Sequence, residues 1–204
     1  ILLTDLPLNH VSGFSHPKLL IYTDRSPVYP EVSSWGLVPH WVKNKDQLKK
    51  LWNNTLNARG ETIFEKPSFR EAAKNSRCIQ KKDQSPMALA GLWSEWYDGE
   101  TNTMLNTFSI VTTVGNSLMA KIHNNPKLEG PRMPVILPSQ LENLWLKPVH
   151  NDLDKEQLET LITAFPENEL EAYTVGRLRG KEYMGNVPEV SEELVYEELV
   201  YSQH

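Results

Sequence analysis

The sequence is poor in cysteine and has no long apolar run. Its 204 residues include one cysteine, Cys78, so an internal disulfide is excluded. Lone thiols are typical of proteins from reducing compartments, and we therefore expect a cytoplasmic location. A membrane-spanning helix needs about eighteen or more consecutive apolar residues, and no such stretch is present. We expect a soluble protein without a membrane partner.

Positive charge, phosphate loops and metal-ligand clusters are also scarce. The formal net charge is −5 at pH 7, which excludes the strongly basic surface of a dedicated duplex-DNA binder. Any nucleic-acid site must therefore be local. No Gly-rich phosphate loop occurs, and His10, His16 and His40 have neither helical i, i+4 spacing nor neighbouring cysteines. The sequence predicts neither a metal site nor a cofactor.

The length and composition fit one globular domain over residues 1–204. The first residue, Ile1, opens an apolar stretch that lacks the basic start and small-residue cleavage site of a signal peptide. We expect the chain to begin inside a longer protein. The sequence leaves its oligomeric state open.

Apolar patterning predicts strands and helices in mixed order. Expected strands cover residues 18–23, 33–38, 77–80, 87–96, 107–113 and 133–137. Expected helices cover residues 46–52, 67–75, 116–122, a segment from 138, and 153–165. The turn residues at 98–102 (DGETN) predict a hairpin between two of the strands. Because no βαβ regularity is present, the predicted fold class is α+β with a mixed, curved sheet.

An amide, a guanidinium and a carboxylate lie close together in the stretch Asn57-Ala58-Arg59-Gly60-Glu61. On an extended backbone alternate residues share one face, so Asn57, Arg59 and Glu61 would point the same way. The Asn57 amide offers a donor and an acceptor, and the planar fork of Arg59 suits phosphate. A charged ligand could bind there. The alternative is a surface ion pair between Arg59 and Glu61 with no ligand.

Two tryptophans flank the turn in Trp35-Gly36-Leu37-Val38-Pro39-His40-Trp41. An exposed Trp41 would stack on an unpaired base, an interaction worth ~1–3 kcal/mol that needs no sequence match and suits single-stranded nucleic acid. The alternative is that both indoles belong to the core, and this is the prediction for Trp35.

His123 closes the helix predicted at residues 116–122. A histidine there is a candidate general acid or base near neutral pH. A positive charge at a helix C-terminus is also favourable without any catalytic role, and the residue alone does not decide between the two.

Five motifs follow one another in a recognisable order: WGLVPHW at 35–41, LNARGET at 56–62, the Arg77-Cys78 strand, IVT at 110–112 followed eleven residues later by His123, and RMPVILP at 132–138. In this order and spacing the chain resembles the SOS-response-associated peptidase (SRAP) family, over about residues 13–138. The resemblance implies an α+β domain with a curved, barrel-like mixed sheet and peripheral helices.

The resemblance also implies a DNA-damage function. Members of the family bind single-stranded DNA that contains abasic sites, and they remove their own initiator methionine as cysteine autopeptidases. The exposed cysteine then reacts through its α-amine and thiol with the ring-opened sugar aldehyde, which gives a stable thiazolidine crosslink. The pairing makes chemical sense because an N-terminal cysteine supplies both nucleophiles. Two alternatives remain: a non-catalytic binder of single-stranded or junction DNA, and a protease acting on other proteins.

Site residues carry over from the family by motif. Asn57 corresponds to the asparagine that holds the terminal cysteine, and His123 to the histidine that assists ring opening and proton transfer. Arg59 and Arg132 match arginines that contact phosphate. Trp41 matches the aromatic beside the DNA, and Thr112 matches a DNA-contacting threonine.

Two family features are missing from the sequence. The Met-Cys start would lie upstream of Ile1, and the Pro-x-x-Gly-aromatic-aromatic-Glu-Trp motif with the catalytic glutamate is replaced by a direct step from Ile79 to Gln80. We expect a segment to be lost between residues 79 and 80. Glu95 only mimics the missing glutamate, since its neighbours match a later strand. An insertion at 124–131 separates His123 from Arg132, which weakens the assignment of that arginine.

Overall fold

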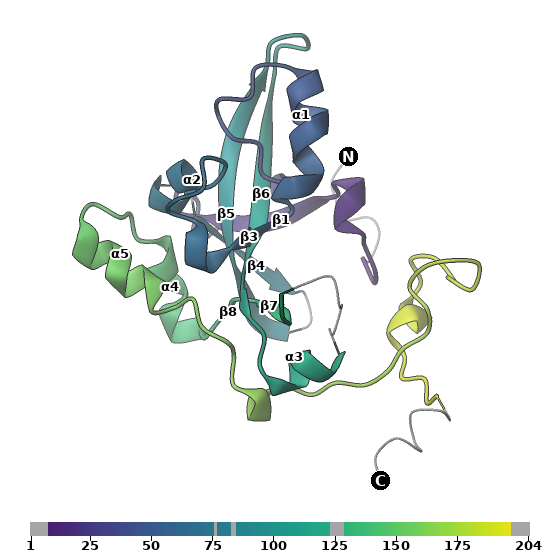
Figure 1. Cartoon of the computed structure of the whole chain (residues 1–204). Helices are drawn as coiled ribbons and strands as arrows, with labels where there is room; N and C mark the ends of the chain where they lie inside the picture. The colour runs from purple at the N-terminus through teal and green to yellow at the C-terminus, as the bar shows by residue number, and fades with distance from the viewer. Residues whose placement is uncertain (1–7, 76, 83–84, 123–128, 197–204) are drawn as a thin grey trace.

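The computed structural model describes residues 8–75, 77–82, 85–122 and 129–196 (Figure 1). Within them, eight strands form one mixed sheet, which confirms the predicted α+β class. The strands are β1 (Lys18–Thr23), β2 (Glu31–Trp35), β3 (Asn57–Arg59), β4 (Arg77–Lys82), β5 (Ser85–Asp98), β6 (Thr103–Val114), β7 (Arg132–Pro134) and β8 (Ile136–Leu137). The α-helices are α1 (Lys45–Leu51), α2 (Arg70–Asn75), α3 (Ser117–Ile122), α4 (Glu142–Leu146) and α5 (Asp152–Glu159).

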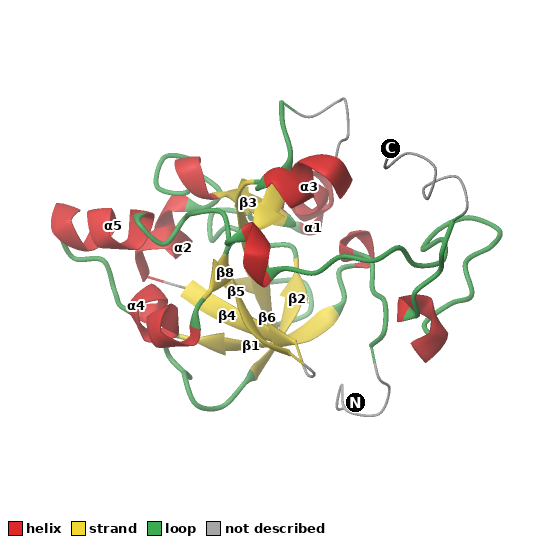
Figure 2. Ribbon diagram, turned by 90° about the horizontal axis from the view of Figure 1, so that it is seen from below, coloured by secondary structure: helices red, strands yellow, loops and turns green. Residues whose placement is uncertain are grey.

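Strand β6 is the centre of the sheet. It pairs in parallel with β2 and β3, and antiparallel with β5 and β7. The pairings also run from β2 to β1, from β1 to β4 and from β4 to β5. The sheet therefore curves round into a barrel-like wall, seen from below in Figure 2, and β3, β7 and β8 extend it.

Each face of this wall packs a different core. Leu19, Ile21 and Phe108 meet on the inner face with other buried apolar side chains. On the outer face Ala58 and Val111 pack with Trp145 of α4 and Leu158 of α5, and Figure 1 shows α2, α4 and α5 along this side. The strict alternation of the two sets along the strands is what a sheet covered on both faces requires.

Several predicted elements have different bounds in the structure. The strand at 18–23 and the hairpin at 98–102 are confirmed. The strand expected at 33–38 ends at Trp35, where Gly36 takes a positive φ of 119°. The helices expected from residue 67 and over 153–165 are shorter: α2 begins at Arg70 and α5 ends at Glu159.

The strand expected at 133–137 is split in two by Val135. Its N–H donates to the Val111 carbonyl of β6, and its own carbonyl accepts from Ala90 of β5, both at 2.9 Å. The chain thus crosses from one neighbour to the next, so β7 pairs with β6 and β8 pairs with β5. Local patterning carries no signal for a change of partner.

The segment after α5 runs back towards the beginning of the described chain. The side-chain oxygen of Asn186 accepts the backbone N–H groups of Asn9 and His10, at 2.8 and 3.0 Å. The His10 ring contacts the Tyr183 hydroxyl at 3.0 Å. Among the helices that the structure describes, none is long and apolar enough to cross a membrane.

Replacing Trp145 should test the outer core. Its side chain is fully buried, and its indole N–H donates to the Gly91 carbonyl at 3.1 Å. We expect Trp145→Ala to lower the free energy of unfolding by about 3–5 kcal/mol, because a large cavity replaces the ring. Urea denaturation measures the change. The exposed Trp41→Ala variant is the control and should shift it by about 0.5 kcal/mol or less; equal losses would contradict this packing.

Candidate functional site

The residues of β3 lie where the barrel-like wall opens. Asn57 pairs with Ile110, and Arg59 pairs with Thr112, along one edge of β6. On the face of β6 that carries Ile110, the exposed fraction of the side chains rises towards the end of the strand, from 7 % at Ile110 to 58 % at Val114. Asn57 and Arg59 therefore project at the rim of the wall, from the same face of the sheet that packs the inner core. We call this rim, with Thr112 and Arg132, the mouth.

The expected shared face is confirmed for Asn57 and Arg59 but not for Glu61, because the extended backbone ends at Arg59 and Gly60–Thr62 forms a 3-10 turn. Both side chains are exposed, whereas Ala58 between them is fully buried in the outer core. The strand is held at its start by Trp35, whose indole N–H donates to the Leu56 carbonyl at 2.9 Å. An amide and a guanidinium are thus presented side by side from a fixed backbone.

Arg132 makes the densest set of polar contacts at the mouth. From β7 it donates to both carboxylate oxygens of Glu61, at 2.8 and 2.9 Å, and to the Thr112 carbonyl at 2.8 Å. This bidentate geometry is the strong form of an ion pair. It ties the 3-10 turn Gly60–Thr62 (η4) to β6 and β7. Glu61 therefore pairs with Arg132, and the alternative of an Arg59–Glu61 pair is wrong.

The Thr112 hydroxyl is held between the same elements. It donates to the Ala58 carbonyl of β3 at 3.3 Å and accepts from Arg132 at 3.2 Å. A hydroxyl has two lone pairs and one proton, so one acceptor position remains. The side chain is half-buried.

Arg59 is the more available cation. Its side chain is 54 % exposed, and its charged contact is with Glu129 at 3.4 Å, a carboxylate that is itself 91 % exposed. Exposed pairs of this kind contribute about 0–1 kcal/mol. The Arg59 guanidinium can exchange this partner for another anion at little cost.

Because Gly60 has no side chain, the mouth packs closely against the segment after α5. A Cβ at Gly60 would overlap Cγ2 of Ile162 and would lie 3.2 Å from the Thr112 carbonyl oxygen. Asn116 caps α3 by accepting the N–H of Met119 at 2.9 Å, and its side-chain amide also donates to the Phe165 carbonyl at 2.9 Å. The chain after α5 thus supports the back of β3 and β6.

Trp41 is exposed, and Trp35 is half-buried against Phe108. The Trp41 indole N–H donates to the Pro67 carbonyl at 3.3 Å, which fixes the ring beside the loop after η4. The alternative that both tryptophans are core is wrong for Trp41. His123 follows the last residue of α3 but lies outside the described residues.

A stacked pair that the sequence did not reveal lies at the end of β2. The rings of His16 and Trp52 are 3.9 Å apart and nearly parallel, at 8°. The His16 Nδ1–H donates to the Trp35 carbonyl at 2.7 Å, and Nε2 lies 3.1 Å from the side-chain oxygen of Asn53. The signal in the sequence was weak, because these residues are far apart along the chain and belong to no motif.

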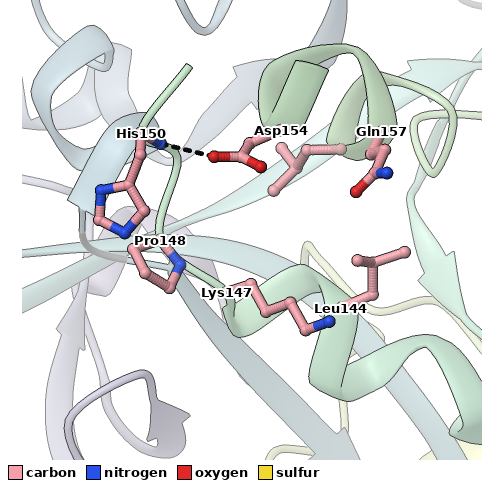
Figure 3. Close-up of a pocket in the computed structure, with 7 residues that line it drawn as sticks. Leu144, Lys147, Pro148, His150, Asp154 and Gln157 are labelled. Carbon is pink, nitrogen blue, oxygen red and sulfur yellow. Dashed lines mark hydrogen bonds between the residues drawn. The ribbon is translucent and has the colours of Figure 1, made fainter. Parts of the chain in front are cut away.

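Cavities also occur away from the mouth. One of about 230 Å³ lies between α4 and α5, with Leu144, His150, Asp154 and Gln157 around it (Figure 3). There the His150 backbone N–H donates to Asp154 at 2.9 Å. It contains none of the predicted site residues. In the part of the chain that the structure describes, no three histidine, cysteine or acidic side chains are placed to hold a metal ion.

The Glu61–Arg132 pair predicts a pH-dependent stability. The hydrogen bonds from Arg132 hold the pKa of Glu61 below its ordinary value of 4.5. A lowered carboxyl pKa stabilises the fold above the unfolded-state pKa, and this contribution is lost as the pH falls through the folded-state value. Glu61 is 43 % exposed, so we expect Glu61→Gln to cost only about 1 kcal/mol at pH 7.

Urea unfolding of wild type and Glu61→Gln at pH 7 and pH 3 measures this difference. It should be present at pH 7 and smaller at pH 3, because pH 3 lies below the ordinary Glu61 pKa of 4.5 and the contribution declines as the pH falls through the lowered value. Glu182→Gln is the control, because Glu182 pairs with Arg177 on a surface where both side chains are 69 % exposed. An equal loss at both pH values for Glu61→Gln would show that the charge of Glu61 is not what stabilises this region.

A family profile and individual related sequences point to the same protein family. The sequence profile of the SOS response associated peptidase (SRAP) family matches residues 14–81 and 79–181. The abasic site processing protein YoqW of Bacillus subtilis (strain 168) is 36 % identical over 166 residues, which cover 71 % of this chain and 68 % of that protein. Mouse abasic site processing protein HMCES is 48 % identical over 50 residues, which cover 24 % of this chain and 14 % of that protein.

A solved structure shares the fold. The crystal structure of a protein from Bacteroides thetaiotaomicron superposes with a TM-score of 0.80 and 31 % sequence identity, over 94 % of this chain and 88 % of that one.

The two stretches matched by the family profile overlap at residues 79–81. This is the step at which we expect the segment with the family's glutamate to be lost. In the structure Ile79 and Gln80 are consecutive residues of β4, paired with Ala90 and Leu89 of β5. The lost segment stays a prediction about the gene product.

Proposed function

The chain belongs to the SRAP family, and on that premise we propose that it processes abasic sites in single-stranded DNA. The observation that carries the proposal is the mouth itself. It presents the exposed amide of Asn57 and the exposed guanidinium of Arg59 from one strand, beside Thr112 and Arg132. The names of YoqW and HMCES as abasic site processing proteins support the choice of substrate. We also propose that the protein is cytoplasmic and associates with the nucleoid when it is bound to DNA.

The proposed chemistry is covalent capture by an N-terminal cysteine that precedes the chain and becomes exposed when the protein removes its initiator methionine. The α-amine attacks the aldehyde of the opened sugar and forms an imine, with loss of water. The thiol then adds to the imine carbon, its proton passes to nitrogen, and a thiazolidine ring closes. Asn57 would hold the cysteine, and His123 would move the protons for ring opening.

Arg59, Arg132, Thr112 and Trp41 are the proposed DNA contacts. Arg59 would exchange Glu129 for a phosphate. Arg132 donates through both terminal nitrogens to Glu61 and Thr112, and its Nε is buried with no partner in the described chain. A guanidinium has five N–H groups, so one on NH1 remains for a phosphate. Trp41 would stack on a base, and Thr112 would offer its remaining lone pair.

Arg59→Ala should weaken binding to single-stranded DNA by about fivefold to tenfold at low salt, because one phosphate contact is lost. The slope of log K against log salt should also fall by about 0.7, the share of one phosphate on a single strand. Fluorescence anisotropy over a salt series measures both. Arg177→Ala, 69 % exposed and also paired with a glutamate, is the matched control. Identical slopes for wild type and Arg59→Ala would remove Arg59 from the interface.

The covalent step is tested with the complete gene product and a single-stranded oligonucleotide that contains one abasic site. We expect a band shift that survives heating, and none with the same oligonucleotide lacking the lesion. Asn57→Ala should slow adduct formation by about tenfold or more, because the nucleophile loses its positioning contact. If a protein with an N-terminal cysteine binds this DNA yet forms no adduct, it is a non-catalytic binder of single-stranded or junction DNA.

A further inference from the structure

We propose that the 3-10 turn Gly13–Ser15 (η2) is a stacking platform for an unpaired DNA base, with Phe14 as the ring that contacts it. The inference rests on the proposed function and extends it to a side of the mouth that none of the predicted site residues occupies.

Phe14 is 62 % exposed. A single exposed apolar side chain is common on protein surfaces and by itself indicates nothing. What sets Phe14 apart is the backbone beneath it, which is fixed at both ends although it belongs to a three-residue turn.

The first end is fixed by packing. Gly13 packs against the Trp35 indole, and a Cβ there would lie in ordinary van der Waals contact with three ring atoms, at 3.4 Å. Within the turn the Ser15 hydroxyl donates to the Ser12 carbonyl at 2.7 Å, and the Ser15 N–H donates to the same oxygen at 3.1 Å. These contacts restrict the backbone on either side of Phe14.

The second end is fixed by His16, which has the left-handed φ of 48°. A non-glycine residue adopts this conformation at a cost, and such strain persists only where the surroundings hold it. Here the surroundings are the Trp35 carbonyl at 2.7 Å, the Asn53 side chain at 3.1 Å and the stacked Trp52 ring at 3.9 Å. Phe14 is therefore presented from a rigid turn, which lowers the entropy lost when a ring stacks on it.

The platform lies next to β3. The Trp35 ring that supports Gly13 donates its N–H to the Leu56 carbonyl, and Leu56 directly precedes Asn57. Along β6, Trp35 pairs with Phe108 and Asn57 pairs with Ile110, two residues further on. At ~3.3 Å per residue these positions are about 7 Å apart along the strand. Trp35, which supports the turn that carries Phe14, is thus followed by Asn57 and then Arg59 along the same edge of β6.

The order suits one DNA strand. Arg59 offers charge for the backbone, and Phe14 offers an uncharged ring for a base beside the lesion. A base that flanks an abasic site has lost a stacking neighbour, so an aromatic ring can take that place. Stacking of this kind is tolerant of sequence because every base has a π-face.

The test compares Phe14→Ala, Phe14→Trp and Tyr29→Ala in the full-length protein. The probe is a single-stranded oligonucleotide with 2-aminopurine beside a tetrahydrofuran abasic analogue, which has no aldehyde, so that binding stays reversible and no adduct forms. We expect Phe14→Ala to bind about fivefold to a hundredfold more weakly, and Phe14→Trp to restore binding. The salt slope should equal that of wild type, since no charge is lost. Quenching of 2-aminopurine on saturation should decrease for Phe14→Ala only.

Tyr29→Ala is the control, because Tyr29 is 76 % exposed in the loop between β1 and β2. Circular dichroism and the thermal midpoint should match wild type for every variant, as each ring is exposed. Wild-type affinity of Phe14→Ala overturns the platform, as does an equal loss in Tyr29→Ala. Failure of the wild type to bind the probe overturns the proposed function as well.

Discussion

The register of β6 is the constraint on which the site depends. Trp35 lies opposite Phe108, Asn57 opposite Ile110, and Arg59 opposite Thr112. A shift by one residue would turn every side chain to the other face, placing Asn57 in the outer core and Ala58 at the mouth. The register is secured because Ala58 and Val111 are fully buried on that outer face. Hydrophobic packing behind the sheet therefore fixes which polar groups appear in front of it.

The electrostatics of the mouth follow from how its charges are paired. Arg59 and Arg132 are matched by Glu129 and Glu61, so these four groups sum to zero. In a chain of net charge −5, long-range attraction of DNA is therefore weak. Affinity has to come from short-range contacts, and Glu129 is the partner most easily displaced because it is almost fully exposed. Aromatic stacking complements such a site, since it contributes without net charge.

The pairing of Glu61 with Arg132 also separates the roles of the two arginines. Arg132 is 19 % exposed and bridges η4, β6 and β7, so its loss would disturb the mouth as well as any phosphate contact. Arg59 has no comparable structural task among the described contacts. Of the two, Arg59 is the one whose substitution reports on ligand binding alone.

The sequence predicted those features that local patterning controls. The strand at 18–23, the hairpin at 98–102 and the shared face of Asn57 and Arg59 all follow from alternation and turn residues. The Glu61–Arg132 pair does not, because 71 positions separate its members. The pairing of the strands, and not the spacing along the sequence, determines that Glu61 pairs with Arg132 and not with Arg59.

Tertiary context also decided where elements begin and end. The segment around Val135 changes its partner strand at that residue, because the Val135 N–H bonds to β6 whereas the Val135 carbonyl bonds to β5. The stack of His16 on Trp52 unites two segments without a shared motif, and Gly36 allows it since a Cβ there would collide with the Trp52 ring. Family resemblance identified the mouth, but its geometry came from contacts that no single stretch encodes.

Gly60 has a consequence for how relatives of this chain can diverge. Its missing side chain is the space into which Ile162 fits, with the Thr112 carbonyl close on the other side. The two positions are therefore not free to drift independently: a larger residue at one should be accompanied by a smaller residue at the other. In an alignment of related sequences the two positions should covary. A chimera that takes β3 from one relative and the segment after α5 from another would combine residues at these positions whose sizes do not fit together.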